Sequence, residues 1–283
     1  MSSSINTNVN AMTALQNLNN TSKQLQQTQN KVSTGLKVNS ASDDGAVWAI
    51  AQNERAQSGS LDAVTQSLQR AQSTVDVATS AGSSISDLLN QTKEKALAAS
   101  DPSLDSTSLA SLNTDFQALL DQITTTVNNA SFNGTNLLDG SSPNGITALT
   151  SADGSSTLTI AAQNLTLSGL GLGSYDPSAS SGATNDISTV AGASQALTYI
   201  NSAISKVATA LGNLGAGSNL LSTQTSFVSN LQDTINTGIG NLVNADLAKE
   251  SASLQALQTK QQLGVQSLSI ANQSSANLLS LFK

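Results

Sequence analysis

The chain has 283 residues with no Cys and no His, which excludes disulfides, thiol nucleophiles, imidazole bases and the commonest zinc ligands. Charged residues make up 10% and aromatic residues 2%, whereas an ordinary globular protein has about 25% charged residues and a core rich in aromatic side chains. The net charge of -7 without a basic stripe argues against nucleic acid as a partner, and no apolar run approaches the roughly 20 residues of a membrane span. We therefore expect long helices with narrow apolar seams and no cofactor or metal, rather than a compact enzyme.

Residues 1–40 predict one amphipathic helix. A helix with a single apolar stripe has to bury that stripe against a partner. The stripe consists of Ile5, Val9, Met12, Leu15, Leu18, Leu25 and Val32. Residues 1–10 have neither a basic start nor an apolar stretch, so we expect no Sec signal peptide.

Heptad spacing is the strongest local signal in the next hundred residues. Apolar and small residues alternate at steps of three and four, which is the pattern of a coiled-coil seam. The first run is Leu61, Val64, Leu68, Ala71, Val75, Ala78, Gly82, Ile85 and Leu89. It is stopped at Asp101-Pro102, as expected of a proline. A second run follows: Leu109, Leu112, Phe116, Leu119 and Ile123.

The central segment 141–189 has a different character. It is rich in Gly, Ser and Thr, and Asp153-Gly154 lies between two short alternating runs at 146–149 and 158–160. This arrangement predicts a β-hairpin, and 164–167 could add another short strand. The segment is dense in exposed hydroxyl groups, so it is either a surface for O-linked sugars or a bare polar loop.

The C-terminal half returns to helical spacing. A seam with members such as Leu197, Ile200 and Val207 continues in phase through the polar residues Ser218, Thr225 and Gln232. Polar seam residues tend to specify register and partner. The last segment carries one more stripe on a polar helix: Leu247, Leu254, Leu257, Val265, Leu268 and Leu278.

The simplest partner for one terminal stripe is the other. The sequence therefore predicts a mainly α fold, a long coiled-coil helical rod with a small β-hairpin region, in which the N- and C-terminal halves pack antiparallel.

Four motifs are distinctive: INTN at 5–8, STGLKVNSASDDGA at 33–46, FNGT at 132–135 and NLLSLFK at 277–283. They resemble those of the bacterial flagellins, in the same order and at matching distances. They cover roughly 1–140 and 190–283, and the short centre is similar to the flagellins of alphaproteobacteria. Many flagellins have a proline in the segment that here reads SSA at 274–276, which is a departure from the family pattern.

The resemblance implies a structural subunit of the flagellar filament that serves swimming motility. Its terminal helices, 1–40 and 245–283, would form an inner coiled coil with the two stripes as assembly surface. A helical rod of 41–140 and 190–244 would form the outer tube, with 141–189 as its β-rich excursion. The implied partners are other copies of the chain, hook-junction and cap proteins, and the flagellar type III export apparatus, which would deliver the subunit outside the cell.

The resemblance also bears on a vertebrate innate receptor that senses many flagellins. Recognised members carry an RVRELAVQ stretch whose first Arg and whose Leu dock in that receptor. Here the equivalent stretch, 91–98, reads QTKEKALA. Gln91 replaces the Arg, Lys95 replaces the Leu, and a neighbouring acidic contact is the shorter Asp115, so we expect this chain to escape recognition.

Two alternative functions remain open at this stage. A hook–filament junction protein shares the terminal helices, and a helical-bundle enzyme could use Asp and Lys side chains. The Ser42-Asp43-Asp44 cluster is open to two interpretations as well. It could be a metal or acid–base site, but a helix cap with acidic residues at a helix N-terminus is the simpler interpretation.

Overall fold

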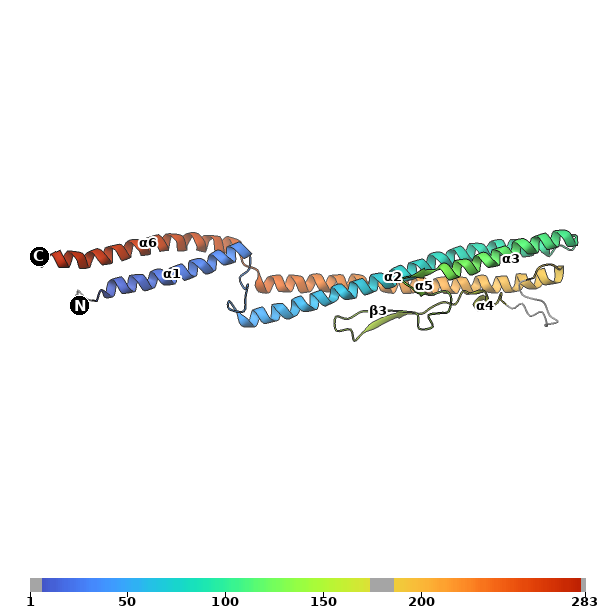
Figure 1. Cartoon of the computed structure of the whole chain (residues 1–283), viewed down its shortest axis with the longest axis horizontal. Coiled ribbons are helices and arrows are strands. Elements are labelled where there is room, and N and C mark those ends of the chain that lie inside the picture. The colour runs from blue at the N-terminus through green and yellow to red at the C-terminus, as the bar shows by residue number, and fades with distance from the viewer. Residues whose placement is uncertain (1–6, 174–185, 281–283) are drawn as a thin grey trace. The chain divides into compact units, whose positions relative to one another are not determined.

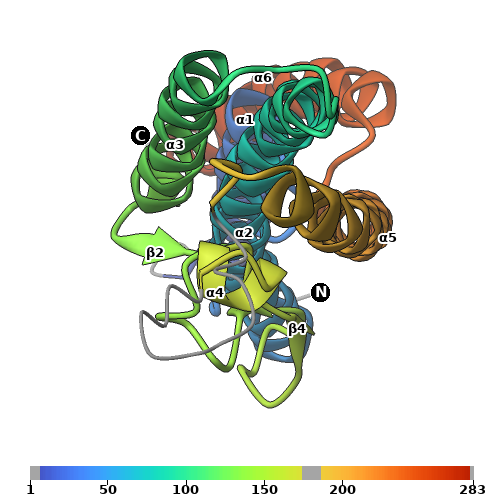
Figure 2. The same cartoon turned by 90° about the vertical axis from the view of Figure 1, so that its right-hand side faces the viewer.

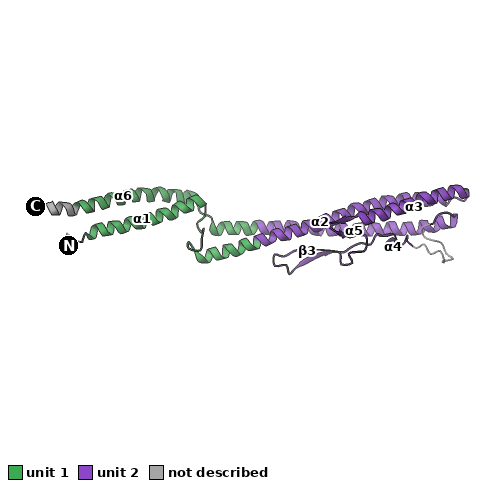
Figure 3. Cartoon of the chain, viewed as in Figure 1, with its two compact units in different colours: residues 1–57, 233–283 green, residues 58–232 purple. Residues whose placement is uncertain are grey.

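The computed structural model describes the backbone of residues 7–173 and 186–280, and the side chains of 7–173 and 186–273. The chain is mainly helical (Figure 1). Its contacts divide it into two units (Figure 3): unit 1 contains 1–57 and 233–283, and unit 2 contains 58–232. The two longest helices contribute residues to both units.

Unit 2 is built on α2 (Gly45–Ala99) and α5 (Val190–Val243), which pack antiparallel. Every residue of the seam predicted along α2 is buried, from Leu61 to Leu89. Gly82 belongs to this seam because α5 comes close there: a Cβ at Gly82 would lie 2.9 Å from Leu211 Cδ2. The heptad interpretation is therefore confirmed in unit 2.

Two polar layers interrupt the apolar seam between these helices. Gln72 Nε2 donates to Ser218 Oγ at 2.7 Å, and Gln232 Nε2 donates to Asp62 Oδ1 at 2.6 Å. Thr225 instead donates to the Leu221 carbonyl oxygen of its own helix. Ser218 and Gln232 thus link α2 to α5, and a shift of register would break both contacts.

A third helix, α3 (Ser106–Asn129), completes the bundle of unit 2. Asp105 caps it by accepting a hydrogen bond from Ser108 N at 2.6 Å. Phe116, the largest fully buried side chain, lies on the face of α3 that packs into the bundle. The predicted seam residue Leu119 is only half-buried, whereas Leu120 is buried, so the seam assignment was wrong by one residue there. Figure 2 shows α2, α3 and α5 seen along their length.

A short hairpin follows α3 directly. Strands β1 (Ser131–Phe132) and β2 (Thr135–Asn136) pair antiparallel around Asn133 and Gly134. Asn136 is buried, donates to the Val127 carbonyl oxygen at 2.7 Å and accepts from Leu138 N at 2.8 Å. This one amide joins the end of α3 to the start of the central segment.

The predicted hairpin at Asp153-Gly154 is present. Strand β3 (Ile146–Leu149) pairs antiparallel with β4 (Thr157–Ile160), in a register that places Ala148 opposite Leu158. The hairpin contacts both long helices, because Leu149 N donates to Ser67 Oγ of α2 and Gln224 Nε2 of α5 donates to the Thr150 carbonyl oxygen.

The strand considered at 164–167 is wrong. Thr166 accepts a hydrogen bond from Gly169 N and caps the short helix α4 (Leu167–Leu170). Part of the hydroxyl-rich central segment, 174–185, lies outside the described residues.

Asp153 stabilises the turn of the β3–β4 hairpin. Its carboxylate accepts hydrogen bonds from Ser151 Oγ at 2.6 Å, Ser155 N at 3.1 Å and Ser155 Oγ at 2.9 Å. These bonds, the one from the Ser151 hydroxyl foremost, favour the charged form and lower the pKa of Asp153 from 3.8 to about 2. A carboxyl group with a lowered pKa contributes stability above its unfolded pKa and loses it as the pH falls through the folded value.

We expect the Asp153 carboxyl to titrate with a midpoint of about 2 in a pH series followed by NMR. The hairpin should lose order as the pH falls from about 4 towards 2. Ser151→Ala should move the midpoint towards the unperturbed value, whereas Ser156→Ala, which removes a hydroxyl of the same loop that does not contact the carboxylate, should not. A midpoint near 3.8 in the unmodified chain would contradict this assignment.

Candidate functional site

The most distinctive surface of unit 1 is formed by helices from the two ends of the sequence. Helix α1 (Val9–Thr34) and helix α6 (Leu247–Ser280) lie side by side and antiparallel (Figure 1). The prediction that the two terminal helices pair with each other is therefore confirmed.

Three polar contacts mark the register of the α1–α6 pair. Asn8 Nδ2 donates to the Ala271 carbonyl oxygen at 2.8 Å near one end. Gln261 Nε2 donates to Ser22 Oγ at 3.4 Å in the middle. Lys31 Nζ lies 3.7 Å from Glu250 Oε1 at the other end. This half-exposed ion pair contributes little free energy, so the apolar seam must hold the helices together.

The seam of α1 is narrow and partly polar. Thr21, Leu25 and Thr28 are buried, and Leu18 and Val32 are half-buried. The two threonines fill positions that a coiled coil normally gives to large apolar residues; Thr21 donates its hydroxyl to the Asn17 carbonyl oxygen in its own helix. The pair therefore buries little apolar area within one chain.

The facing seam of α6 includes a small residue at its centre. Leu254, Leu257 and Leu268 are half-buried. A Cβ added at Gly264 would lie 3.2 Å from Leu18 Cδ1, so the glycine lets α1 approach closely. A groove of about 1040 Å³ runs along this pair, with Leu18, Leu263 and Ile270 among its lining residues.

Both helices also carry large apolar side chains outside the buried seam. We call this set of side chains the outer face. Its members are large apolar side chains that the single chain leaves between 47% and 64% exposed. They are Val9, Met12, Leu15, Leu247, Leu263, Val265 and Ile270.

The structure thus separates the stripe residues predicted from sequence into two groups, one paired across the seam and one exposed. It brings together Leu18, Leu25 and Val32 with Leu254, Leu257 and Leu268. It leaves Val9, Met12, Leu15, Leu247 and Val265 on the outer face. Ile5 lies outside the described residues, as does the side chain of Leu278.

Three seam members were not predicted from the sequence: Thr21, Thr28 and Gly264. The outer-face members Leu263 and Ile270 were not predicted either. Heptad spacing alone would have found Thr21 and Thr28, because they lie three residues after Leu18 and Leu25, had polar residues been admitted to the seam.

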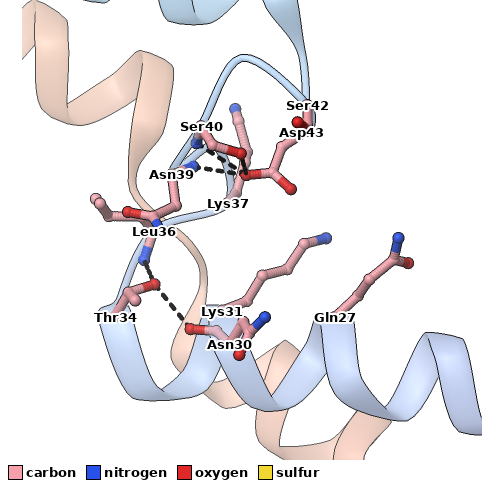
Figure 4. A pocket seen from close by; sticks show the side chains of 10 residues that line it. All are labelled: Gln27, Asn30, Lys31, Thr34, Leu36, Lys37, Asn39, Ser40, Ser42 and Asp43. Carbon is pink, nitrogen blue, oxygen red and sulfur yellow. Dashed lines mark hydrogen bonds between the residues drawn. The ribbon is translucent and has the colours of Figure 1, made fainter.

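The connector between α1 and α2 is held by short-range hydrogen bonds (Figure 4). Gly35 ends α1 in the left-handed conformation, with φ of 73°. Asp43 Oδ2 accepts hydrogen bonds from Asn39 N, Ser40 N and Ser40 Oγ. These bonds, that from Asn39 N foremost, lower the pKa of the Asp43 carboxyl. A polar cavity of about 270 Å³ lies beside this turn.

Asp44 caps α2, because its Oδ1 accepts hydrogen bonds from Ala46 N and Val47 N. The cap interpretation of the Ser42-Asp43-Asp44 cluster is therefore confirmed for Asp44, while Asp43 closes the preceding turn. In the described part of the chain, no three Asp or Glu side chains gather in a way that could hold a metal ion.

The same connector is joined to the end of α5 within unit 1. Lys37 N donates to the Val243 carbonyl oxygen at 2.7 Å, and Ala245 N donates to the Gly35 carbonyl oxygen at 2.8 Å. Val38, Ala51, Ile239 and Val243 form a small buried cluster beneath these bonds. The cluster joins the connector and the start of α2 to the end of α5 in unit 1.

The three receptor-equivalent residues lie in unit 2. Gln91 is exposed on α2, and Lys95 is half-exposed one turn further along the same helix. Lys95 Nζ lies 2.7 Å from Asp115 Oδ2 of α3, so the two charged positions pair with each other within the chain.

As to membrane insertion, none of the helices in the described ranges combines the length and the apolar character that a bilayer crossing needs.

Comparison with known proteins places this arrangement in one family. Residues 5–143 match the bacterial flagellin N-terminal helical region, and residues 197–282 match the bacterial flagellin C-terminal helical region. Flagellin FljM of Caulobacter vibrioides is 51% identical over 280 residues, which is 99% of this chain and 98% of that protein. A flagellin of Brucella melitensis is 36% identical over 99% of both chains.

A solved structure supports the fold at greater distance. A putative flagellar hook-associated protein from Vibrio parahaemolyticus superposes with a TM-score of 0.54 at 16% identity, over 71% of this chain and all of that one. At this identity the similarity concerns the fold alone. The two family matches and the relatives of nearly equal length show that this chain belongs to the bacterial flagellins and is a structural subunit of the flagellar filament, not an enzyme.

Proposed function

We propose that copies of this chain polymerise with one another through the outer faces of α1 and α6. The observation that carries this proposal is the set of seven large apolar side chains that the single chain leaves about half or more exposed on these two helices. Large exposed apolar patches usually mark interaction sites.

The energies support assembly through this face. Burying one exposed Val, Leu, Ile or Met side chain yields about 1.5–3 kcal/mol before the costs of association. Ordering the backbone of a helix costs about 1–2 kcal/mol per residue, and a helix held by one narrow seam is marginal in water. Contacts between copies would therefore both order the terminal helices and hold the filament.

The finer partners follow from family membership. Hook-junction and cap proteins would bind the ends of a filament made of this chain, and the flagellar type III export apparatus would secrete it to the cell exterior. The sequence alone had left a hook–filament junction protein as the alternative. It is disfavoured by relatives named as flagellins that match nearly the whole chain. A filament subunit is the major protein of sheared flagella, whereas a junction protein is a minor one, so abundance separates the two.

Deleting residues 250–283 removes almost all of α6, and with it three of the seven outer-face side chains. We expect a chain that stays water-soluble and largely helical, because the contacts of unit 2 do not involve this segment. Circular dichroism should record the retained helix content, and electron microscopy should show no filaments under conditions in which the full chain assembles. Filaments formed by the truncated chain would refute the proposal.

Single substitutions on the outer face make a sharper test. Leu263→Ser and Ile270→Ser change side chains that are 58% and 61% exposed in the single chain, so they should leave its helix content unchanged. Each should raise the critical concentration for polymerisation by about tenfold or more, because one apolar side chain is no longer buried on assembly.

Gln262→Ser is the matched control, since it shortens an exposed polar residue of the same helix. Sedimentation assays over a concentration series measure the critical concentration. If Ile270→Ser polymerises at the same concentration as Gln262→Ser, the outer face does not drive assembly.

We further propose that the surface around Gln91 and Lys95 does not dock on the innate receptor that senses many flagellins. Gln91 lacks the guanidinium that the resemblance places at this position. The Lys95 ammonium is paired at 2.7 Å with the carboxylate of Asp115, so an apolar receptor pocket would have to separate this pair and desolvate the ammonium.

Restoring both positions with Gln91→Arg and Lys95→Leu should recover signalling in a receptor reporter assay. Anchors at the centre of an interface contribute about 2 kcal/mol or more each, so their loss weakens binding by orders of magnitude. Asn90→Arg is the matched control, because it adds the same guanidinium at the neighbouring exposed position. Strong signalling by the unmodified chain would show that this proposal is wrong.

A further inference from the structure

The turn between β1 and β2 holds an unusual asparagine. Asn133 has φ of 50° and is the one non-glycine residue with positive φ in the described part of the chain; Gly134 follows with φ of 78°. Positive φ at both central residues of a two-residue loop is the type I′ geometry. We propose that Asn133 is a site of spontaneous deamidation and isoaspartate formation in the folded protein.

The reaction uses two groups of the turn and solvent water. The backbone nitrogen of Gly134 attacks Cγ of Asn133, an N–Cγ bond forms, the Cγ–Nδ2 bond breaks, and the amide nitrogen leaves as ammonia with the proton from the Gly134 nitrogen. Water then opens the resulting five-membered imide at either carbonyl. One opening gives Asp at position 133, and the other gives isoaspartate, in which the backbone passes through the former side chain. No electrons are transferred.

Both reacting groups of the turn are free. Over the described residues, neither the Asn133 carboxamide nor the Gly134 N–H has a hydrogen-bond partner. Both residues are exposed, and the direction in which a Gly134 Cβ would point is open, with no described atom within 4 Å. Glycine offers no side chain to hinder the attack of its nitrogen on Cγ of Asn133.

The chain contains a second Asn-Gly pair that serves as an internal comparison. Gly145 N donates to the Ser142 carbonyl oxygen at 2.8 Å, so the nucleophile next to Asn144 is already engaged. Gly145 also packs against the backbone of Ile160, where even a Cβ would collide with the carbonyl oxygen. The two pairs have the same sequence and opposite environments.

The products at position 133 would alter the surroundings of the turn. Either product adds one negative charge to an exposed site, and isoaspartate lengthens the loop by one backbone carbon. A type I′ loop of two residues sets the register of its strands, here Phe132 with Thr135 and Ser131 with Asn136. Asn136 is the buried amide that joins α3 to the central segment, so isoaspartate at 133 would loosen that junction.

The test is to incubate the purified full chain at neutral pH in its folded state and to quantify both sites by peptide mapping with mass spectrometry. Isoaspartate is measured independently with an isoaspartyl methyltransferase. We expect deamidation at Asn133 to proceed about tenfold faster than at Asn144, because the hydrogen bond of Gly145 N–H must break before it can react. In denaturant the two rates should become comparable, since the reacting Asn-Gly dipeptide is the same.

A substitution at position 133 gives an independent test. Asn133→Gly keeps a residue that adopts positive φ and therefore keeps the turn, but it removes the carboxamide. It should lose most of the methyltransferase signal of the folded chain. Equal rates at the two sites in the folded protein, a faster rate at Asn144, or an undiminished signal in Asn133→Gly would each overturn the proposal.

Discussion

A narrow apolar seam buries only one side of a helix, and this constraint governs both units of the protein. With aromatic residues at 2% of the chain, no helix can obtain a broad core from a few large side chains. Each helix instead needs a partner that runs along most of its length. In unit 2, α2 and α5 satisfy this need with a continuous seam from Leu61 to Leu89 on one side and from Ile200 to Val228 on the other. Gly82 allows a close approach of Leu211 of α5 within this seam.

Polar residues within the seams restrict how the helices can pair. An apolar seam with a regular repeat tolerates a shift by one heptad, because the same kinds of residue meet again. The contacts of Gln72 with Ser218 and of Gln232 with Asp62 exist in one register only. In unit 1, the contact of Asn8 with Ala271 and that of Gln261 with Ser22 do the same for α1 and α6. Hydrogen bonds thus specify the register of each helix pair, and buried apolar area holds the two helices together.

The α1–α6 pair differs from the α2–α5 pair in what it leaves uncovered. Thr21 and Thr28 occupy buried seam positions, while large residues such as Met12 and Ile270 are more than 60% exposed. A chain selected only to fold by itself would place these residues the other way round. The terminal region of a filament subunit has to meet two requirements. It must be stable enough to form helices, and it must keep apolar surface exposed for contacts with neighbouring subunits. This distribution explains how membership in the flagellin family is compatible with so little burial in the terminal helices.

Local features were predictable from sequence because short-range interactions decide them. The heptad steps of α2, the end of that helix before Pro102, the Asp44 cap and the Asp153-Gly154 hairpin all depend on residues within one or two turns of each other. The β1–β2 hairpin was missed although Asn133-Gly134 is a turn signal, because two-residue strands leave no alternating pattern. The strand considered at 164–167 was wrong because the Thr166 hydroxyl stabilises a helical turn instead.

The amino-acid sequence by itself determined that the chain forms long helices, that its two ends carry apolar stripes, and that it is a flagellin, since periodicity and motifs are properties of the chain order. Only the tertiary structure decided which stripe residues meet within the chain and which remain exposed. Helical spacing is compatible with several faces, and the choice among them depends on the close approach that Gly264 allows and on contacts such as Asn8 with Ala271. The pairing of Lys95 with Asp115 and the docking of the hairpin on Ser67 likewise join residues of different elements, and the distance between such residues is set by packing rather than by spacing along the chain.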